Sequence, residues 1–172
     1  FGDSKFHCWK RTGHGSMNLM SGITQSCDVY FYEVARRTGI DRISAMARRF
    51  GFGERLGIEL PGEKKGLMPT RKWKKRTKGV RWQQGETLLA GIGQGFLLAT
   101  PLQLAVMISR LSNGGRRVVP SILRQLVPFG APEPEPAELR QFPEIDVNKN
   151  HLRLIGRAMA RVTNSPRGTA YR

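Results

Sequence analysis

The sequence predicts a mainly helical fold, with loops and at most short strands between the helices. Apolar residues recur at helical spacing in several separate stretches of the 172 residues. Thr100-Pro101-Leu102-Gln103 indicates a helix start, because threonine and glutamine form a capping box and proline suits the first helical position. The intervening segments are rich in glycine, proline and charge, which is typical of loops. The length favours a single domain with one sizeable core.

Three helices are expected in the first third of the chain. The first begins near Met17. The second follows the triplet Ser26-Cys27-Asp28 and ends at Gly39, and the third follows at once and ends at Gly51. Their apolar faces hold Phe31, Val34 and Ala35 in the second helix and Ile40, Ile43, Ala47 and Phe50 in the third.

The rest of the chain is expected to alternate loops with two helices. Residues 52–84 contain much glycine and charge and are predicted to be a long ordered loop. The helix that starts at Thr100 is apolar on more than one face, so it is predicted to be buried all round. The remaining expectations are short extended pieces over 118–127, a proline-acid connector over 128–136 and a last helix over about 148–162.

The charge of the chain is strongly positive: 29 lysines and arginines against 13 acidic residues give a formal net charge of +16. Such a field attracts polyanions, including nucleic acid, anionic lipid head groups and pyrophosphate-bearing molecules. Nine of the basic residues fall between Lys64 and Arg81 without an acidic residue, and Trp73 and Trp82 are interleaved. Two interpretations of this basic run remain open: a solvated loop, or a surface that contacts a polyanion.

The triplet Ser26-Cys27-Asp28 is the candidate catalytic feature. It precedes an apolar and aromatic run, Val29 to Tyr32, that would anchor the turn in a core. Serine–lysine acyltransferases need a second hydroxyl beside the nucleophile to relay a proton and orient the substrate, and the alternative is an ordinary helix N-cap. No serine is followed three residues later by lysine, and no Lys-Thr-Gly or Lys-Ser-Gly occurs. Because such an enzyme needs both motifs, the chain holds only one part of an active site.

Cys8, His14 and Cys27 are the candidate metal ligands. Thiolate and imidazole are ligands that zinc favours, and a tetrahedral site needs a fourth, for which Asp3 and His7 are candidates. The spacing matches no standard zinc finger. Three interpretations stay open: a zinc site, a Cys8–Cys27 disulfide in an oxidising compartment, or unrelated residues.

Several short motifs occur in the order in which one known family carries them. The distinctive pair is Gly91-Ile92-Gly93-Gln94-Gly95 followed by Thr100-Pro101-Leu102-Gln103. The others are His14-Gly15, the Ser-Cys-Asp triplet, Tyr30-Phe31-Tyr32, Gly39-Ile40-Asp41, Gly57-Ile58-Glu59-Leu60-Pro61 and Met68-Pro69-Thr70. With these motifs, essentially the whole chain resembles the penicillin-binding protein 2 family, the class B, elongation-type D,D-transpeptidases of bacterial cell-wall synthesis.

The resemblance implies a mainly α fragment of the α/β serine β-lactamase/penicillin-binding transpeptidase-like fold. Residues 1–172 are then expected to be a partial transpeptidase domain, with the Ser-x-x-Lys segment upstream and the Lys-Thr-Gly strand downstream. Ser26 and Asp28 are implied to be catalytic: they stand at the family's Ser-x-Asn position, where the serine assists the catalytic lysine and the third residue binds the peptide or β-lactam. The whole enzyme is implied to be a serine-type D-Ala-D-Ala transpeptidase or carboxypeptidase, and the isolated fragment is expected to be inactive.

The resemblance also implies a cofactor, partners and a location. Some members carry a structural zinc site beside this motif, at positions that match Cys8, His14 and Cys27, with an acidic ligand upstream. The implied partners are stem peptides, β-lactams and elongation-complex membrane proteins including a glycosyltransferase, with no nucleic acid. The implied location is the periplasmic face of the bacterial inner membrane, and the anchor is not expected in this chain, which has no apolar run of 18 residues. The competing hypothesis is a basic, zinc-stabilised module that binds nucleic acid or another polyanion through Lys64–Arg81.

Overall fold

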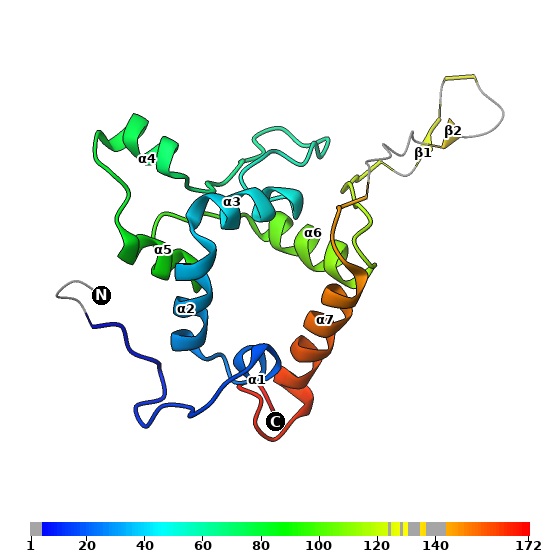
Figure 1. The fold of residues 1–172 in the computed structure, drawn as a ribbon. Helices are drawn as coiled ribbons and strands as arrows, with labels where there is room; N and C mark the ends of the chain where they lie inside the picture. The colour runs from blue at the N-terminus through cyan, green and yellow to red at the C-terminus, as the bar shows by residue number, and fades with distance from the viewer. Residues whose placement is uncertain (1–4, 124, 128, 131–134, 137–143) are drawn as a thin grey trace.

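The computed structural model describes residues 5–123, 125–127, 129–130, 135–136 and 144–172. Within these residues the fold is mainly helical, as predicted (Figure 1). Its elements are α1 (Leu19–Thr24), α2 (Asp28–Thr38), α3 (Ile40–Arg49), α4 (Arg71–Lys78), α5 (Gln84–Gly91), α6 (Pro101–Ser112), β1 (Gln125–Leu126), β2 (Glu135–Pro136) and α7 (Lys149–Asn164). The two short strands pair antiparallel. Most of the predicted connector over 128–136 lies outside the described residues.

Five predicted helices are confirmed, and local signals explain where they begin and end. Asn18 and Ser21 form a capping box at the start of α1. At the start of α6, Oγ1 of Thr100 accepts the N–H of Gln103 at 3.1 Å, as the sequence predicted. Gly39 separates α2 from α3 with a φ of 78°, a backbone conformation that glycine adopts without steric cost.

The prediction of a long loop over residues 52–84 is wrong in its second half, where α4 forms and α5 begins. Oγ1 of Thr70 caps α4 by accepting the N–H of Trp73 at 3.0 Å. Lys74, on the inner face of α4, is buried and forms an ion pair with Glu86 of α5. The local composition does not indicate this helix, because contacts with the rest of the fold supply most of its stability.

The packing of α2 against α5 depends on two small residues. A Cβ atom added to Gly91 of α5 would lie 2.4 Å from the Cβ of Ala35 of α2, so the two helices approach as closely as a glycine permits. Ala35 is buried in this contact. On the other side of the fold, α1 packs against α7, which runs from α6 back to α1 (Figure 1). The turn between α1 and α2 is therefore held by packing on both of its flanks.

Helix α6 is not buried all round, in contrast to the prediction. Leu104 and Ile108 are 47% and 42% exposed, whereas Gln103 is buried. The side-chain amide of Gln103 tolerates burial because its Nε2 donates to the carbonyl oxygens of Glu54 and Lys65 at 2.8 and 3.0 Å. Helix α6 therefore uses a polar residue to hold the segment that leads to α4.

Candidate functional site at the Ser-Cys-Asp turn

Ser26 lies in the short turn between α1 and α2 and has an unusual backbone conformation. Its φ is 49°, and it is the only residue other than glycine in the described ranges with a positive φ. For a residue with a Cβ atom, the left-handed region costs about 1–2 kcal/mol, and such strain tends to occur at functional sites. Two backbone bonds close the turn: the N–H of Ser26 donates to Ile23 at 3.2 Å and the N–H of Cys27 donates to Gly22 at 2.9 Å.

Trp9 holds the turn from the N-terminal loop. Its indole Nε1–H donates to the carbonyl oxygen of Ser26 at 2.9 Å, and its backbone N–H donates to Oδ2 of Asp28 at 3.0 Å. The indole ring also contacts His14 edge to face, with ring centroids 5.4 Å apart. Trp9 therefore joins the turn that carries Ser26 and Asp28 to the loop that carries Cys8 and His14.

Thr169 holds the same turn from the C-terminal side. Its hydroxyl lies 2.9 Å from Oγ of Ser26, and its backbone N–H donates to the carbonyl oxygen of Thr24 at 3.3 Å. Ser26 and Thr169 are 143 residues apart in the sequence, and no motif in the sequence indicates this pairing. The bond to Thr169 orients the hydroxyl of Ser26. Because Ser26 is also exposed, this hydroxyl remains open to a reacting molecule.

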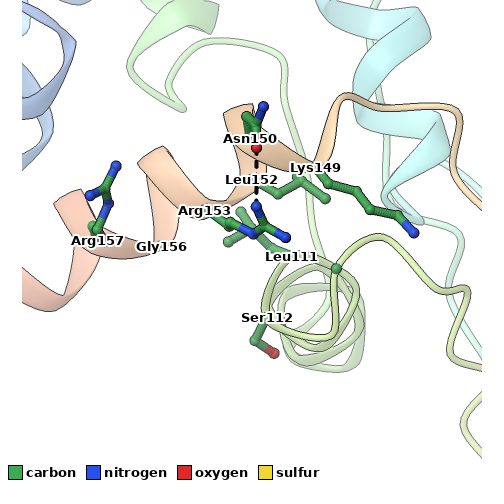
Figure 2. A pocket seen from close by; sticks show the side chains of 9 residues that line it. Leu111, Ser112, Lys149, Asn150, Leu152, Arg153, Gly156 and Arg157 are labelled. Carbon is green, nitrogen blue, oxygen red and sulfur yellow. Dashed lines mark hydrogen bonds between the residues drawn. The ribbon is translucent and has the colours of Figure 1, made fainter.

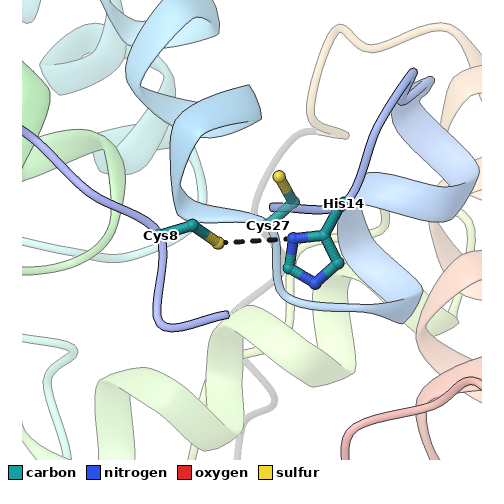
Figure 3. Close-up of side chains that lie close together, drawn as sticks. All are labelled: Cys8, His14 and Cys27. Carbon is teal, nitrogen blue, oxygen red and sulfur yellow. Dashed lines mark hydrogen bonds between the residues drawn. The ribbon is translucent and has the colours of Figure 1, made fainter. Parts of the chain in front are cut away.

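Cys8, His14 and Cys27 come together as the sequence predicted (Figure 3). Their Sγ and ring-nitrogen atoms all lie within 4.8 Å of one another, and Sγ of Cys8 is 3.3 Å from Nδ1 of His14. Cys27 is buried, and burial raises the pKa of its thiol; the backbone N–H of Tyr30 lowers it, and Cys8 raises it further. His7 is exposed and is not among the residues of this cluster, and Asp3 lies outside the described residues.

The cluster fits a zinc ion in its donor atoms and in its size. With Zn–S and Zn–N bonds of about 2.3 and 2.0–2.1 Å, a tetrahedral site separates a sulfur from a nitrogen ligand by roughly 3.6 Å and two sulfurs by roughly 3.8 Å. The observed 3.3 Å between Cys8 and His14 is close to the first of these separations. Both cysteines are free, so the structure does not contain the disulfide that the sequence left open.

The described residues also form a hollow away from the Ser-Cys-Asp triplet and the cysteine–histidine cluster. It has a volume of about 640 Å³ and is bounded by the end of α6 and by α7, with Leu111, Leu152 and Arg153 among its lining residues (Figure 2). Nη1 of Arg153 donates a hydrogen bond to Oδ1 of Asn150 at 3.1 Å. No residue of the triplet or of the cysteine–histidine cluster lines this hollow, so it is separate from the candidate site.

The described helices are too short or too polar to span a bilayer: none of them combines the necessary length with a sufficiently apolar window.

Known proteins provide an independent comparison. The whole chain, residues 1–172, matches the family model of the penicillin binding protein transpeptidase domain. Peptidoglycan D,D-transpeptidase MrdA of Acinetobacter baumannii is 45% identical over 150 residues, which cover 87% of this chain and 22% of that protein. The chain spans about a quarter of the length of the curated relatives that it matches.

Solved structures agree with this result. Pseudomonas aeruginosa PBP2, in complex with WCK 5153, superposes with a TM-score of 0.88 at 38% identity, covering 98% of this chain and 36% of that one. The PBP2 of Helicobacter pylori, in complex with MreC, gives a TM-score of 0.83 at 35% identity and covers 99% of this chain and 30% of that one. The predicted resemblance and the mainly α part of a transpeptidase fold are confirmed. This chain belongs to the transpeptidase domain family of the penicillin-binding proteins, with relatives of the penicillin-binding protein 2 type.

Proposed function

We propose that the chain is part of a peptidoglycan D,D-transpeptidase and that Ser26 is one of its catalytic residues. The observation that carries the proposal is the state of Ser26: an exposed hydroxyl on a strained turn, held by Trp9 on one side and Thr169 on the other. Electrostatic and acid–base catalysis needs groups that are fixed before the reaction begins. A hydroxyl in this setting suits proton relay between the nucleophile, its lysine and the leaving group.

The reaction proposed for the whole enzyme has two steps. In the first, the hydroxyl oxygen of the nucleophilic serine attacks the carbonyl carbon of the penultimate D-alanine of a stem peptide. The terminal D-alanine leaves, and its amine takes up the proton that the serine loses. In the second, an amine of a neighbouring stem peptide attacks the ester, which forms the cross-link and returns a proton to the serine. A β-lactam acylates the same serine.

Asp28 is proposed to help bind the peptide or β-lactam at the position where asparagine is usual in the wider family. When ionised, a carboxylate accepts hydrogen bonds and donates none. Oδ2 of Asp28 already accepts the N–H of Trp9 at 3.0 Å, so its other oxygen is the one proposed to face the substrate. Aspartate therefore suits an N–H group of the ligand, and it gives up the donor that asparagine would offer to a carbonyl oxygen.

The chain is proposed to be a partial transpeptidase domain over residues 1–172. The chain contains neither Ser-x-x-Lys nor Lys-Thr-Gly, and it spans about a quarter of the length of its curated relatives. The nucleophilic segment and the Lys-Thr-Gly strand are accordingly proposed to belong to other parts of the same protein. By itself the chain is expected neither to turn over peptide nor to form a covalent penicillin adduct, which intact-mass measurement checks directly.

We also propose that Cys8, His14 and Cys27 hold a structural zinc ion. When bound, zinc supplies a cross-link between the N-terminal loop and the start of α2 and keeps the thiols ionised. The two sulfur ligands directly precede Trp9 and Asp28, whose hydrogen bond supports the turn. The ion is therefore proposed to stabilise the position of Ser26 without taking part in the reaction.

The proposed location is the periplasmic face of the bacterial inner membrane, with stem peptides and β-lactams as ligands. The solved PBP2 of Helicobacter pylori is in complex with MreC, and another neighbour belongs to a peptidoglycan synthase complex. These neighbours support elongation-complex proteins as partners, and a glycosyltransferase is proposed to be among them. The competing polyanion-binding module has less support, because Trp73 and Trp82 both contact Phe96 and so are engaged within the fold.

Penicillin acylation of the full-length protein tests the role of Ser26. In S26A, the rate of covalent labelling by a fluorescent penicillin is expected to fall about 100-fold or more, since acid–base groups contribute about 10²–10⁴-fold. The matched control is S16A, because Ser16 is an exposed serine of the preceding loop. Equal labelling rates in wild type, S26A and S16A would show that Ser26 takes no part in the acylation reaction.

A further inference from the structure

A second site, distinct from the Ser26 turn, lies where α3, α4 and α5 begin. It is a hollow of about 440 Å³, lined by the basic side chains of Arg36, Arg71, Lys75 and Arg81 and by the indole of Trp82. These residues come from the last turn of α2, from α4 and from the segment before α5. We call this hollow the basic pocket. It shares no lining residue with the Ser-Cys-Asp triplet or the cysteine–histidine cluster.

The basic pocket carries an excess of positive charge. Glu33 bridges Arg36 and Arg37 at 2.7 and 2.6 Å, and the bonds to these two guanidinium groups lower the pKa of Glu33 to about 2. Asp41 lies 3.4 Å from Arg71. Even if both carboxylates are assigned to the pocket, its four basic residues leave a net charge of +2 (4 − 2).

Two of the four cations have no acidic partner in the part of the chain that the structure describes. Lys75 and Arg81 form no ion pair with any residue that the structure describes, and both are exposed. Lysine presents a compact charge with three donors, and arginine presents a planar fork that matches phosphate oxygens. Together they offer complementary donors for a single anionic group.

Three helix starts border the basic pocket. Gly39 is the N-cap of α3, Arg71 is the first residue of α4 and Gln84 is the first residue of α5, and all three line the basic pocket. The start of a helix carries a partial positive charge, and its backbone N–H groups favour anions. The start of α3 has no side-chain cap. The N–H of Arg71 already donates to Oδ1 of Asp41 at 3.2 Å, and Glu86 lies in the first turn of α5, so the side-chain cations are the main source of attraction for an anion.

The walls of the basic pocket are supported by interactions behind them. Lys74 pairs with Glu86 and joins α4 to α5, while Nε1 of Trp82 donates to Oγ1 of Thr87 at 2.8 Å. Trp73 contacts Phe96 edge to face at 5.4 Å between ring centroids. A site formed before the ligand arrives loses less conformational entropy on binding.

We propose that the basic pocket binds a compact phosphate or pyrophosphate group, with Lys75 and Arg81 as its principal ligands. The small volume matches one multiply charged group, and so do the two cations that form no ion pair within the described ranges. An extended polyanion would instead contact the whole basic run from Lys64 to Arg81, including Lys72 and Arg76 of α4. The phosphate belongs either to a soluble molecule or to a lipid head group, and the two sources share the same chemistry.

Calorimetric titration of the full-length protein with inorganic pyrophosphate at about 0.15 M salt tests the proposal. Replacing Lys75 and Arg81 by alanine is expected to weaken binding at least about tenfold, because hydrogen bonds to charged groups contribute about 1.5–3 kcal/mol each. The matched control replaces Lys72 and Arg76, which carry the same charge on α4 but do not line the basic pocket. In that control, the affinity is expected to change less than about threefold.

Vesicles distinguish the two sources of phosphate. If the source is a lipid, the protein binds vesicles containing phosphatidylglycerol, pyrophosphate competes, and the K75A/R81A variant binds them more weakly than K72A/R76A. If pyrophosphate binds and the vesicles do not, the source is soluble. The proposal is overturned if pyrophosphate does not bind, or if the two double variants weaken its binding equally, since that result indicates a diffuse field. Thermal unfolding of all variants verifies that each is folded.

Discussion

The backbone N–H of Trp9 donates a hydrogen bond to Oδ2 of Asp28 at 3.0 Å. Trp9 follows one candidate zinc ligand, Cys8, and Asp28 follows another, Cys27. The cysteine–histidine cluster and the Ser26 turn are therefore two sides of one structural unit, and a change in either is expected to affect the other.

Trp9 is expected to act as a positioning residue for Ser26. W9F retains an aromatic ring and removes the Nε1 donor to the carbonyl oxygen of Ser26, a bond of 2.9 Å. A hydrogen bond contributes about 1 kcal/mol, so the rate constant for acylation by penicillin should fall about fivefold. The dissociation constant of the initial non-covalent complex should stay unchanged. W73F serves as the control, and a W9F acylation rate like that of wild type contradicts the assignment.

Metal analysis of the full-length protein is expected to find one zinc ion per chain, held by Cys8, His14 and Cys27. Chelation should release the ion, lower the melting temperature and make the thiol of Cys8 react with a maleimide, whereas the buried thiol of Cys27 should react more slowly. C8S and H14A should lose the metal. C8D should retain it, because carboxylate is also a zinc ligand, and H7A should behave like wild type, because His7 lies outside the cluster. Stoichiometric zinc in C8S/H14A, or none in wild type, contradicts the assignment.

G91A is expected to destabilise the protein by about 1–3 kcal/mol, because the new methyl group overpacks the contact between α5 and α2. The added Cβ would lie 2.4 Å from that of Ala35. A35G in the same chain should recover part of the loss. G156A is the matched control: Gly156 lies in α7, and a Cβ there meets nothing within 4 Å. That change should be neutral or stabilise by up to about 1 kcal/mol. Urea denaturation measures all four proteins.

The ion pair between Lys74 and Glu86 is expected to matter for stability because the lysine is buried. K74M leaves the carboxylate of Glu86, which is 21% exposed, without its cationic partner and should cost about 1–3 kcal/mol. Adding E86Q removes the orphaned charge and should recover part of this loss. K78M, at an exposed lysine of the same helix, should change the free energy of unfolding by no more than about 0.5 kcal/mol. A K74M variant as stable as K78M shows that the pair contributes nothing.

Local sequence signals predicted much of the fold and part of the site. The capping box at Thr100 and the glycine at Gly39 act within a few residues, so the boundaries they predict are confirmed. Helix α4 was missed because the burial of Lys74 depends on Glu86, an interaction that composition cannot reveal. The gathering of Cys8, His14 and Cys27 was predicted from their ligand chemistry and a family resemblance. Thr169 was not predicted, since only the packing of α7 against α1 brings it to Ser26.

The burial of Lys74 also gives the fold an internal reporter. Lys72, Lys75 and Lys78 on the same helix are exposed, and their amines are open to acylating reagents in the native protein. Lys74 becomes available to such reagents only when α4 separates from α5. The extent of labelling at this one lysine, compared with its three neighbours by peptide mass analysis, thus records how often the wall of the basic pocket opens.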